Sequence, residues 1–223
     1  MAEIEALLFD IDGTLITSGG AGAEAWRRAF EELHDVDVDI HKVTESGMTD
    51  PEVGLTALRT VLGRDPEKRE LSLSLARYLR HLPDTVREST GYRVMAGIET
   101  LLERLVDTGI LLGLVTGNVE AAAHVKLSRA GLNRFFCFGG YGSDASDRAE
   151  LTRRGIERAA MVSGGMVEPA ECVSVGDTPR DVAAGHGAGI RVVGVATGNY
   201  GIDELREVGA DWALETVEVG FPV

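Results

Sequence analysis

The amino-acid sequence predicts an α/β fold: a doubly wound, mostly parallel sheet with an all-helical insertion after its first strand. Six short runs are apolar almost throughout instead of alternating with polar residues, which is typical of strands that a parallel sheet buries on both faces. Helical patterns separate the last five runs, and such alternation builds a sheet through right-handed crossovers. We expect the strands at residues 4–9, 110–115, 135–139, 172–175, 191–196 and 211–214.

The helices of the sheet region are predicted from apolar residues at helical spacing. One begins near Ile98 and ends at Gly109, a residue suited to the left-handed conformation that closes many helices. The others are expected at residues 119–130, 151–162, 179–184 and 203–208.

The insertion lies between the first two strands, where three apolar stripes at helical spacing begin near Ala25, Leu55 and Leu71. Asp50-Pro51 and Asp65-Pro66 offer an N-cap and a first helical residue for two of these helices. Amphipathic helices without a strand cannot share the core of the sheet efficiently, so we expect a separate bundle. This predicts a helical domain at residues 17–87 and an α/β domain formed by residues 1–16 and 88–223.

The composition and charge indicate which partners the protein can bind and in which compartment it is expected. The chain has 223 residues, 44% of them hydrophobic, and a net charge of −14, which repels nucleic acid and anionic membranes. No stretch approaches the ~20 apolar residues of a membrane span, and the acidic N-terminus is unlike a signal peptide. We therefore expect a cytoplasmic protein, monomeric or homodimeric, that binds neither nucleic acid nor membrane.

The cysteines and histidines indicate neither a zinc site nor a redox pair. Cys137 and Cys172 lie in apolar runs without C-x-x-C spacing, so we expect buried thiols in a reducing compartment. The five histidines are scattered without ligand spacing, and surface or structural roles are expected for them.

Two aspartates mark the end of the first strand, in the segment Asp10-Ile11-Asp12-Gly13-Thr14. An unpaired buried carboxylate is costly, and a divalent cation is a partner that two carboxylates at a strand end can share. Open α/β sheets also bind ligands just outside the carboxyl ends of their strands. An acidic turn explains the pair equally well, because Asp-Gly is a common turn sequence.

A second motif, Thr116-Gly117-Asn118, stands where the second strand gives way to a helix. Backbone N–H groups at a helix N-terminus, together with the helix dipole, bind anions. An ordinary N-cap role for Thr116 is compatible with contact to a phosphate.

The third motif follows the fourth strand and contains Asp177, Thr178 and Asp181. Thr178 is a good N-cap and Asp181 falls at the third helical position, where capping explains it as well as function does. Capping does not explain Asp177, which stands at the strand end and is free to join Asp10 on a metal ion.

Together the three motifs, D-x-D-G-T-L, hydrophobic-T-G-N and hydrophobic-G-D-T-P-x-D, resemble the haloacid dehalogenase superfamily, in its phosphoglycolate phosphatase-like branch. The similarity covers essentially the whole chain, with the motifs in the order of the family. It implies a Rossmann-like core domain and identifies the helical insertion as similar to the smaller cap domain of the family. The segment between Gly47 and Asp50 resembles a cap loop that meets substrate, although capping explains Asp50 equally well.

The resemblance implies a role for each aspartate. Asp10 would be the nucleophile that forms an aspartyl-phosphate, and Asp12 the general acid and base. Mg²⁺ would be held by the Asp10 carboxylate, the backbone carbonyl of Asp12, and Asp177. Asp181 would support Asp177 from behind.

Phosphate binding would fall to Thr116 and the backbone amides of Gly117 and Asn118. The family usually places a lysine before the helix that precedes the Gly-Asp strand, and this chain has none there. Arg148 is nearest in register, and Lys126 on the helix after Thr116 is the other candidate, with a solvated surface lysine equally expected for it.

These features predict a Mg²⁺-dependent phosphatase of a small phosphorylated metabolite. Dehalogenation is disfavoured, because members with that activity lack a second acid such as Asp12. A phosphomutase of the β-phosphoglucomutase type shares all three motifs and stays open as an alternative. A non-catalytic module that binds a phosphometabolite is the other, supported only by the missing lysine.

Overall fold

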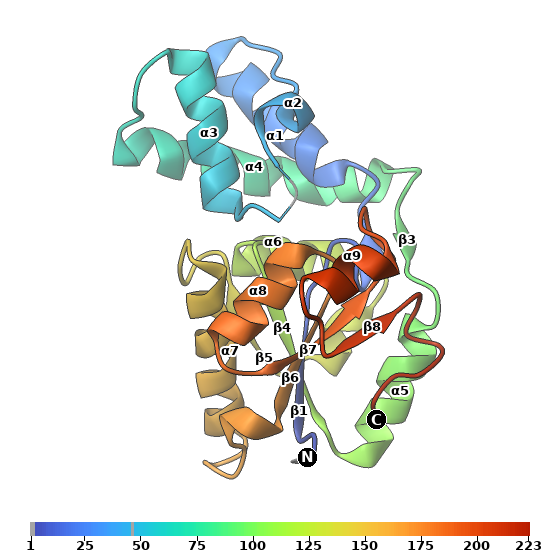
Figure 1. The fold of residues 1–223 in the computed structure, drawn as a ribbon. Coiled ribbons are helices and arrows are strands. Elements are labelled where there is room, and N and C mark those ends of the chain that lie inside the picture. Colours follow the sequence, from blue (N-terminus) through green and yellow to red (C-terminus); the bar gives the residue numbers. More distant parts are fainter. Residues whose placement is uncertain (1–2, 46) are drawn as a thin grey trace.

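The computed structural model describes residues 3–45 and 47–223, and it confirms the predicted α/β fold (Figure 1). Six parallel strands form one sheet in the order β5-β4-β1-β6-β7-β8, so that β1 lies between β4 and β6. The strands are β1 (Ala6–Phe9), β4 (Leu111–Thr116), β5 (Phe138–Tyr141), β6 (Cys172–Gly176), β7 (Arg191–Val195) and β8 (Trp212–Leu214).

Helices cover both faces of the sheet, because successive side chains of a buried strand point to opposite faces. Leu7 and Phe9 pack with apolar residues of α5 and α6, whereas Ala6 and Leu8 pack with α7 on the other face. The helices of this region are α5 (Ile98–Thr108), α6 (Glu120–Ser128), α7 (Arg148–Val162), α8 (Pro179–Gly187) and α9 (Ile202–Glu207), with the 3₁₀ turns η1 (Leu132–Phe135) and η2 (Pro169–Glu171).

The predicted strand over residues 135–139 begins late, at Phe138, because the residues up to Phe135 form the turn η1. Cys137 therefore lies outside the strand and is exposed, so the expectation that both thiols are buried is wrong for it. Cys172 begins β6 and is buried as expected.

Where the structure describes it, the inserted segment forms four helices above the carboxyl end of the sheet (Figure 1): α1 (Ala21–His34), α2 (Ile40–Val43), α3 (Asp50–Leu62) and α4 (Lys68–Glu88). Their own apolar cluster centres on Trp26 of α1 and Tyr78 of α4, whose rings stack with centroids 4.4 Å apart. The domain division at residues 17 and 87 stays a prediction.

The insertion differs from the sequence-based expectation in its helix caps and in its connections to the sheet region. Helix α4 is capped by Glu67, not by Asp65, because Glu67 forms a capping box with Glu70. Thr49, not Asp50, is the N-cap of α3, because it forms a reciprocal capping box with Glu52. Two short strands, β2 (Ile16–Thr17) and β3 (Arg93–Val94), pair antiparallel where the chain leaves and re-enters the sheet region. Two-residue strands are too short to leave a periodic pattern in the sequence. Within the described residues, none of the helices has both the length and the hydropathy needed to cross a bilayer.

Candidate active site

Three adjacent strands bring the sequence motifs together. Phe9, the last residue of β1, pairs with Leu114 of β4 and with Val175 of β6, so these parallel strands end at the same edge. Asp10 and Asp12 follow β1, the motif beginning with Thr116 follows β4, and that of Asp177 follows β6. This edge is where open α/β sheets bind ligands.

Asp10, Asp177 and Asp181 form a buried carboxylate cluster in which one oxygen of each lies within 4.8 Å of the others. Burial, and after it the negative charge of Asp181, raises the pKa of Asp10 to about 7, against the opposing charge of Arg148. Burial and the charges of Asp181 and Asp10 raise the pKa of Asp177 to about 8. A hard divalent cation is the partner that such an all-oxygen cluster suits.

The carboxylate of Asp177 is held between two glycine positions. A Cβ atom on Gly13, whose φ is +90°, or on Gly198 would overlap this carboxylate, so only glycine leaves it room. Thr14 donates a hydrogen bond from its hydroxyl to Asp177 Oδ1 over 3.1 Å. Gly13 and Thr14, in the turn that follows β1, thus hold the side chain of Asp177 at the end of β6.

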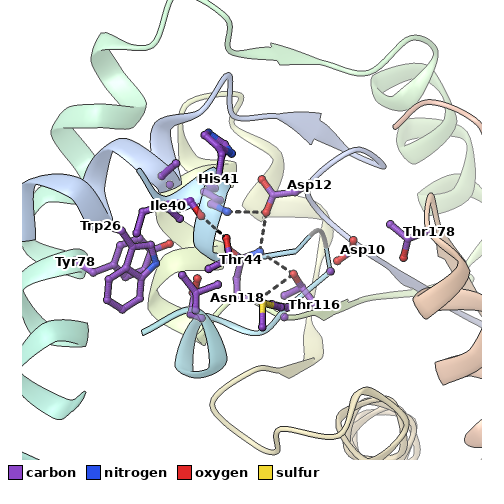
Figure 2. A pocket seen from close by; sticks show the side chains of 18 of the residues that line it. Asp10, Asp12, Trp26, Ile40, His41, Thr44, Tyr78, Thr116, Asn118 and Thr178 are labelled. Atoms are coloured by element: carbon purple, nitrogen blue, oxygen red, sulfur yellow. Dashed lines mark hydrogen bonds and ion pairs between the residues drawn. The ribbon is translucent and has the colours of Figure 1, made fainter. Parts of the chain in front are cut away.

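The side chain of Asp12 faces a different set of partners (Figure 2). Its Oδ2 accepts hydrogen bonds from Lys126 Nζ over 2.6 Å and from Asn118 Nδ2 over 2.9 Å. Asn118 also donates to the Thr116 hydroxyl over 2.8 Å. Burial alone would raise the pKa of Asp12, but the charge and hydrogen bond of Lys126, helped by Asn118, outweigh it and lower the pKa. The carboxylate is therefore ionised in this arrangement.

Both candidate cations reach the site, at separate places. Arg148 begins α7; its guanidinium donates to Asp181 and lies 3.8 Å from Asp10 Oδ1. It also donates to the Gly47 carbonyl of the helical unit over 3.2 Å. Lys126 is buried, which excludes the solvated surface lysine.

Asp181 combines the two roles that the sequence left open. Its Oδ2 accepts hydrogen bonds from the Thr178 amide over 3.0 Å and from the Thr178 hydroxyl over 2.7 Å, which completes the capping box of α8. Its Oδ1 faces Arg148, and an oxygen belongs to the carboxylate cluster with Asp10 and Asp177.

A cavity of about 210 Å³ lies between the strand ends and the helical unit (Figure 2). The α/β region contributes its floor, through the strand ends and the helices α6 and α7: Asp10, Asp12, Thr116, Gly117, Asn118, Lys126, Arg148 and Thr178. The helical unit contributes its roof, which includes Gly22, Ala23, Trp26, Ile40, His41, Thr44, Asp50, Val53 and Tyr78. Most of these roof residues could not be predicted as cavity residues from the sequence. A helix face that packs against its neighbours carries the same apolar pattern whether or not its edge borders a cavity.

Asp50 joins roof and floor by two hydrogen bonds. Its amide donates to the Gly117 carbonyl over 2.8 Å, and its Oδ2 accepts from the Val119 amide over 2.8 Å. Burial, opposed by the charge of Lys126 and by the hydrogen bonds from Val119 and Tyr78, raises the pKa of Asp50 to about 6.

This raised pKa predicts a pH-dependent stability. A carboxyl whose pKa is higher in the folded than in the unfolded chain stabilises fully at acidic pH, and that contribution is lost as pH rises through about 6. Relative to wild type, Asp50→Asn should therefore gain about 1–3 kcal/mol in free energy of unfolding between pH 4.5 and pH 8. Urea denaturation across this range measures the difference. Asp84→Asn, at an exposed position of α4, is the matched control. Parallel pH profiles for wild type and Asp50→Asn would contradict the prediction.

Comparison with known proteins agrees with the motifs and the fold. The model of the haloacid dehalogenase-like hydrolases matches residues 4–189. A phosphoglycolate phosphatase of Rhodospirillum rubrum is 31% identical over 98% of this chain and 92% of its own. A glyceraldehyde 3-phosphate phosphatase of Methanopyrus kandleri is 27% identical over 88% of this chain and 86% of its own.

Among solved structures, a protein from Haemophilus somnus described as a predicted phosphoglycolate phosphatase superposes with a TM-score of 0.75 at 20% identity. The superposition covers 97% of this chain and 96% of that one, so the two share their fold. With the family model spanning most of the sequence and a relative above 30% identity along nearly all of it, this chain belongs to the haloacid dehalogenase-like hydrolase family.

Proposed function

We propose that this hydrolase is a Mg²⁺-dependent phosphatase that cleaves a small phosphorylated metabolite through an aspartyl-phosphate on Asp10, as a phosphoglycolate phosphatase-like enzyme would. One observation carries the proposal: Asp10 shares a buried carboxylate cluster with Asp177 and Asp181 and, together with Asp12, lines a cavity of about 210 Å³. The curated relatives named as phosphatases support it.

The cluster fits a magnesium ion by its chemistry, since Mg²⁺ prefers oxygen ligands and is commonly held by one or two carboxylates. The ion would be held by the carboxylates of Asp10 and Asp177 and by the backbone carbonyl of Asp12. Asp181 would support Asp177 without binding the ion. Bound there, the ion would neutralise the charge that otherwise keeps the Asp10 carboxylate and a phosphate apart. Burial first, and then the charges of the neighbouring carboxylates, raise the pKa values of Asp10 and Asp177, and a bound cation would oppose both effects.

The protein's own groups account for the remaining chemistry. One Asp10 oxygen would attack phosphorus, while Thr116 and the amides of Gly117 and Asn118 orient the transferring group. Asp12 would give a proton to the departing alkoxide and later take one from the hydrolytic water. Because its pKa is lowered, Asp12 is ionised and ready for the second task; for the first, it would take up the proton of a phosphate monoanion, whose second pKa is about 6, and pass it to the alkoxide.

Arg148 is the group we assign to the phosphate, and Lys126 the group that holds Asp12. Arg148→Ala is expected to lower kcat by about 10²–10³-fold, the usual effect of removing one transition-state donor, and Lys126→Ala to lower it less. Steady-state phosphate release compares the two variants. Because Arg148→Ala leaves buried carboxylates unpaired, its thermal unfolding must be measured too, and Arg148→Lys should recover part of the rate. Near-wild-type rates in both alanine variants would show that neither cation faces the phosphate.

Metal removal tests the proposed function directly. The purified protein should hydrolyse p-nitrophenyl phosphate with Mg²⁺, lose this activity in a chelator, and regain it when Mg²⁺ is restored. A panel of phosphorylated metabolites, with free phosphate as the readout, then defines the substrate. Interconversion of sugar phosphates without phosphate release would favour a phosphomutase instead. An absence of turnover across the panel would favour a non-catalytic binding module.

A further inference from the structure

The permanent positive charges that line the cavity are both engaged by carboxylates. Among the described residues that line the cavity, the only lysine is Lys126 and the only arginine is Arg148, and both belong to its floor. Lys126 Nζ lies 2.6 Å from Asp12 and also feels the negative charge of Asp50. Arg148 donates to Asp181 and lies 3.8 Å from Asp10. Each cation thus already faces two carboxylates before any substrate enters.

The roof is mostly uncharged. In Figure 2 the rings of Trp26 and Tyr78 lie together on the side of the cavity away from Asp10 and Thr178. The other apolar lining residues of the roof include Ala23, Ile40, Met48 and Val53. Asp50 brings a buried carboxylate to the roof, and His41, an exposed residue of α2, is the only basic side chain among its described lining residues.

The position of the phosphorus atom determines which residues of the cavity contact the leaving group. With phosphorus at Asp10 and Thr116, the rest of the substrate would have to extend past Asp12 towards the aromatic pair of the roof, because Asp12, Trp26 and Tyr78 line the remainder of the cavity. A second anionic group there would lie near the carboxylates of Asp12 and Asp50. Burying an anion without a partner is costly, and like charges add to that cost. A substrate hydroxyl needs only a hydrogen bond, and the Thr44 hydroxyl oxygen, whose own proton goes to the Ile40 carbonyl, can accept one.

From this distribution of charge we infer that the substrate is the phosphate monoester of a small uncharged alcohol, and that esters whose leaving group carries a carboxylate or a second phosphate are poor substrates. The inference rests on the proposed phosphatase function and narrows it. The cavity of about 210 Å³ has room for a phosphate and a small leaving group, and because it is partly open to solvent it does not exclude a longer one.

Matched pairs of esters test the inference on the unmodified protein. 2-Hydroxyethyl phosphate and phosphoglycolate have the same length and differ in one terminal group, and so do glyceraldehyde 3-phosphate and 3-phosphoglycerate. With Mg²⁺ and phosphate release as the readout, kcat/KM should be at least about tenfold higher for the uncharged member of each pair. Equal values, or a preference for the carboxylates, would overturn the inference.

A positive charge added to the roof should shift the preference from the uncharged esters towards the esters that carry a carboxylate. Thr44 lines the cavity, and its hydroxyl donates to the Ile40 carbonyl over 2.8 Å. Thr60, on the exposed side of α3, donates to the Thr56 carbonyl over 3.1 Å, so Thr60→Lys is a control that loses the same type of bond. Thr44→Lys should move the ratio of kcat/KM at least about tenfold towards the carboxylates, and Thr60→Lys should leave it unchanged. An unchanged ratio in a folded Thr44→Lys protein would overturn the inference.

p-Nitrophenyl phosphate separates failure of the inference from failure of the proposed function. If the protein hydrolyses this ester with Mg²⁺ but prefers phosphoglycolate and 3-phosphoglycerate, only the inference is wrong. If it hydrolyses neither this ester nor any of the four matched substrates, the phosphatase function is wrong and the inference falls with it.

Discussion

Asp10→Asn is expected to abolish phosphate release, lowering kcat by at least about 10⁴-fold, because removal of a covalent nucleophile has effects of this size or larger. The substitution keeps the shape of the side chain and removes the atom that would bond to phosphorus. Rapid acid quench after mixing with a phosphorus-labelled substrate provides a second readout. Wild type should retain base-labile label on the protein, and the variant should retain none.

The stability of Asp10→Asn separates loss of chemistry from loss of folding. Burial and the charge of Asp181 already raise the pKa of Asp10 to about 7, so a neutral side chain relieves repulsion in the cluster. Without added metal, the variant should therefore unfold at a denaturant concentration at least as high as wild type at pH 8. A well-folded variant with more than a hundredth of the wild-type rate would contradict the assignment of Asp10 as nucleophile.

Asp12→Asn is expected to lower kcat by about 10²–10⁴-fold with an alkyl phosphate, the usual contribution of a general acid and base. The asparagine oxygen can still accept the hydrogen bond that Lys126 donates to Asp12 over 2.6 Å, so the packing between α6 and the β1 loop should survive. The variant loses the capacity to carry a proton, and with it the negative charge that pairs with the buried Lys126. Steady-state kinetics with an alkyl phosphate measure the loss.

The choice of leaving group makes the test of Asp12 specific. An alkoxide needs a proton as it departs, whereas p-nitrophenolate leaves readily without one. Asp12→Asn should therefore reduce turnover of p-nitrophenyl phosphate less than turnover of an alkyl phosphate whenever departure of the leaving group limits the rate. A loss under tenfold with the alkyl ester would contradict the acid role.

The sequence was sufficient for the parts of the site that depend on strand ends. Asp10, Thr116 and Asp177 each follow a buried apolar run, and parallel strands place their carboxyl ends on one edge of a sheet. Local chemistry also determined the start of α8, where Thr178 and Asp181 form the capping box that their spacing predicts. The same reasoning was off by one residue at α3, because Thr49 competes with Asp50 as N-cap.

The partners of the two cations could not be read from the chain. Lys126 lies on a short helix whose pattern fits a solvent-facing lysine, and its burial depends on how the helical unit covers α6. Arg148 is the first residue of α7, and only the packing of this helix beside the β6–α8 turn brings its guanidinium to Asp10 and Asp181.

By itself the sequence determined the α/β fold, the order of the motifs and the edge where the aspartates meet, because hydrophobic periodicity and helix capping act over a few neighbouring residues. Only the tertiary structure decided which cation faces which carboxylate and which residues of the helical unit line the cavity. It also decided that Lys126 and Arg148 are both paired with carboxylates, so that neither is available to a charged leaving group. These properties depend on contacts between residues far apart in the chain, such as Asp50 with Val119 and Lys126 with Asp12. No local pattern encodes such distances.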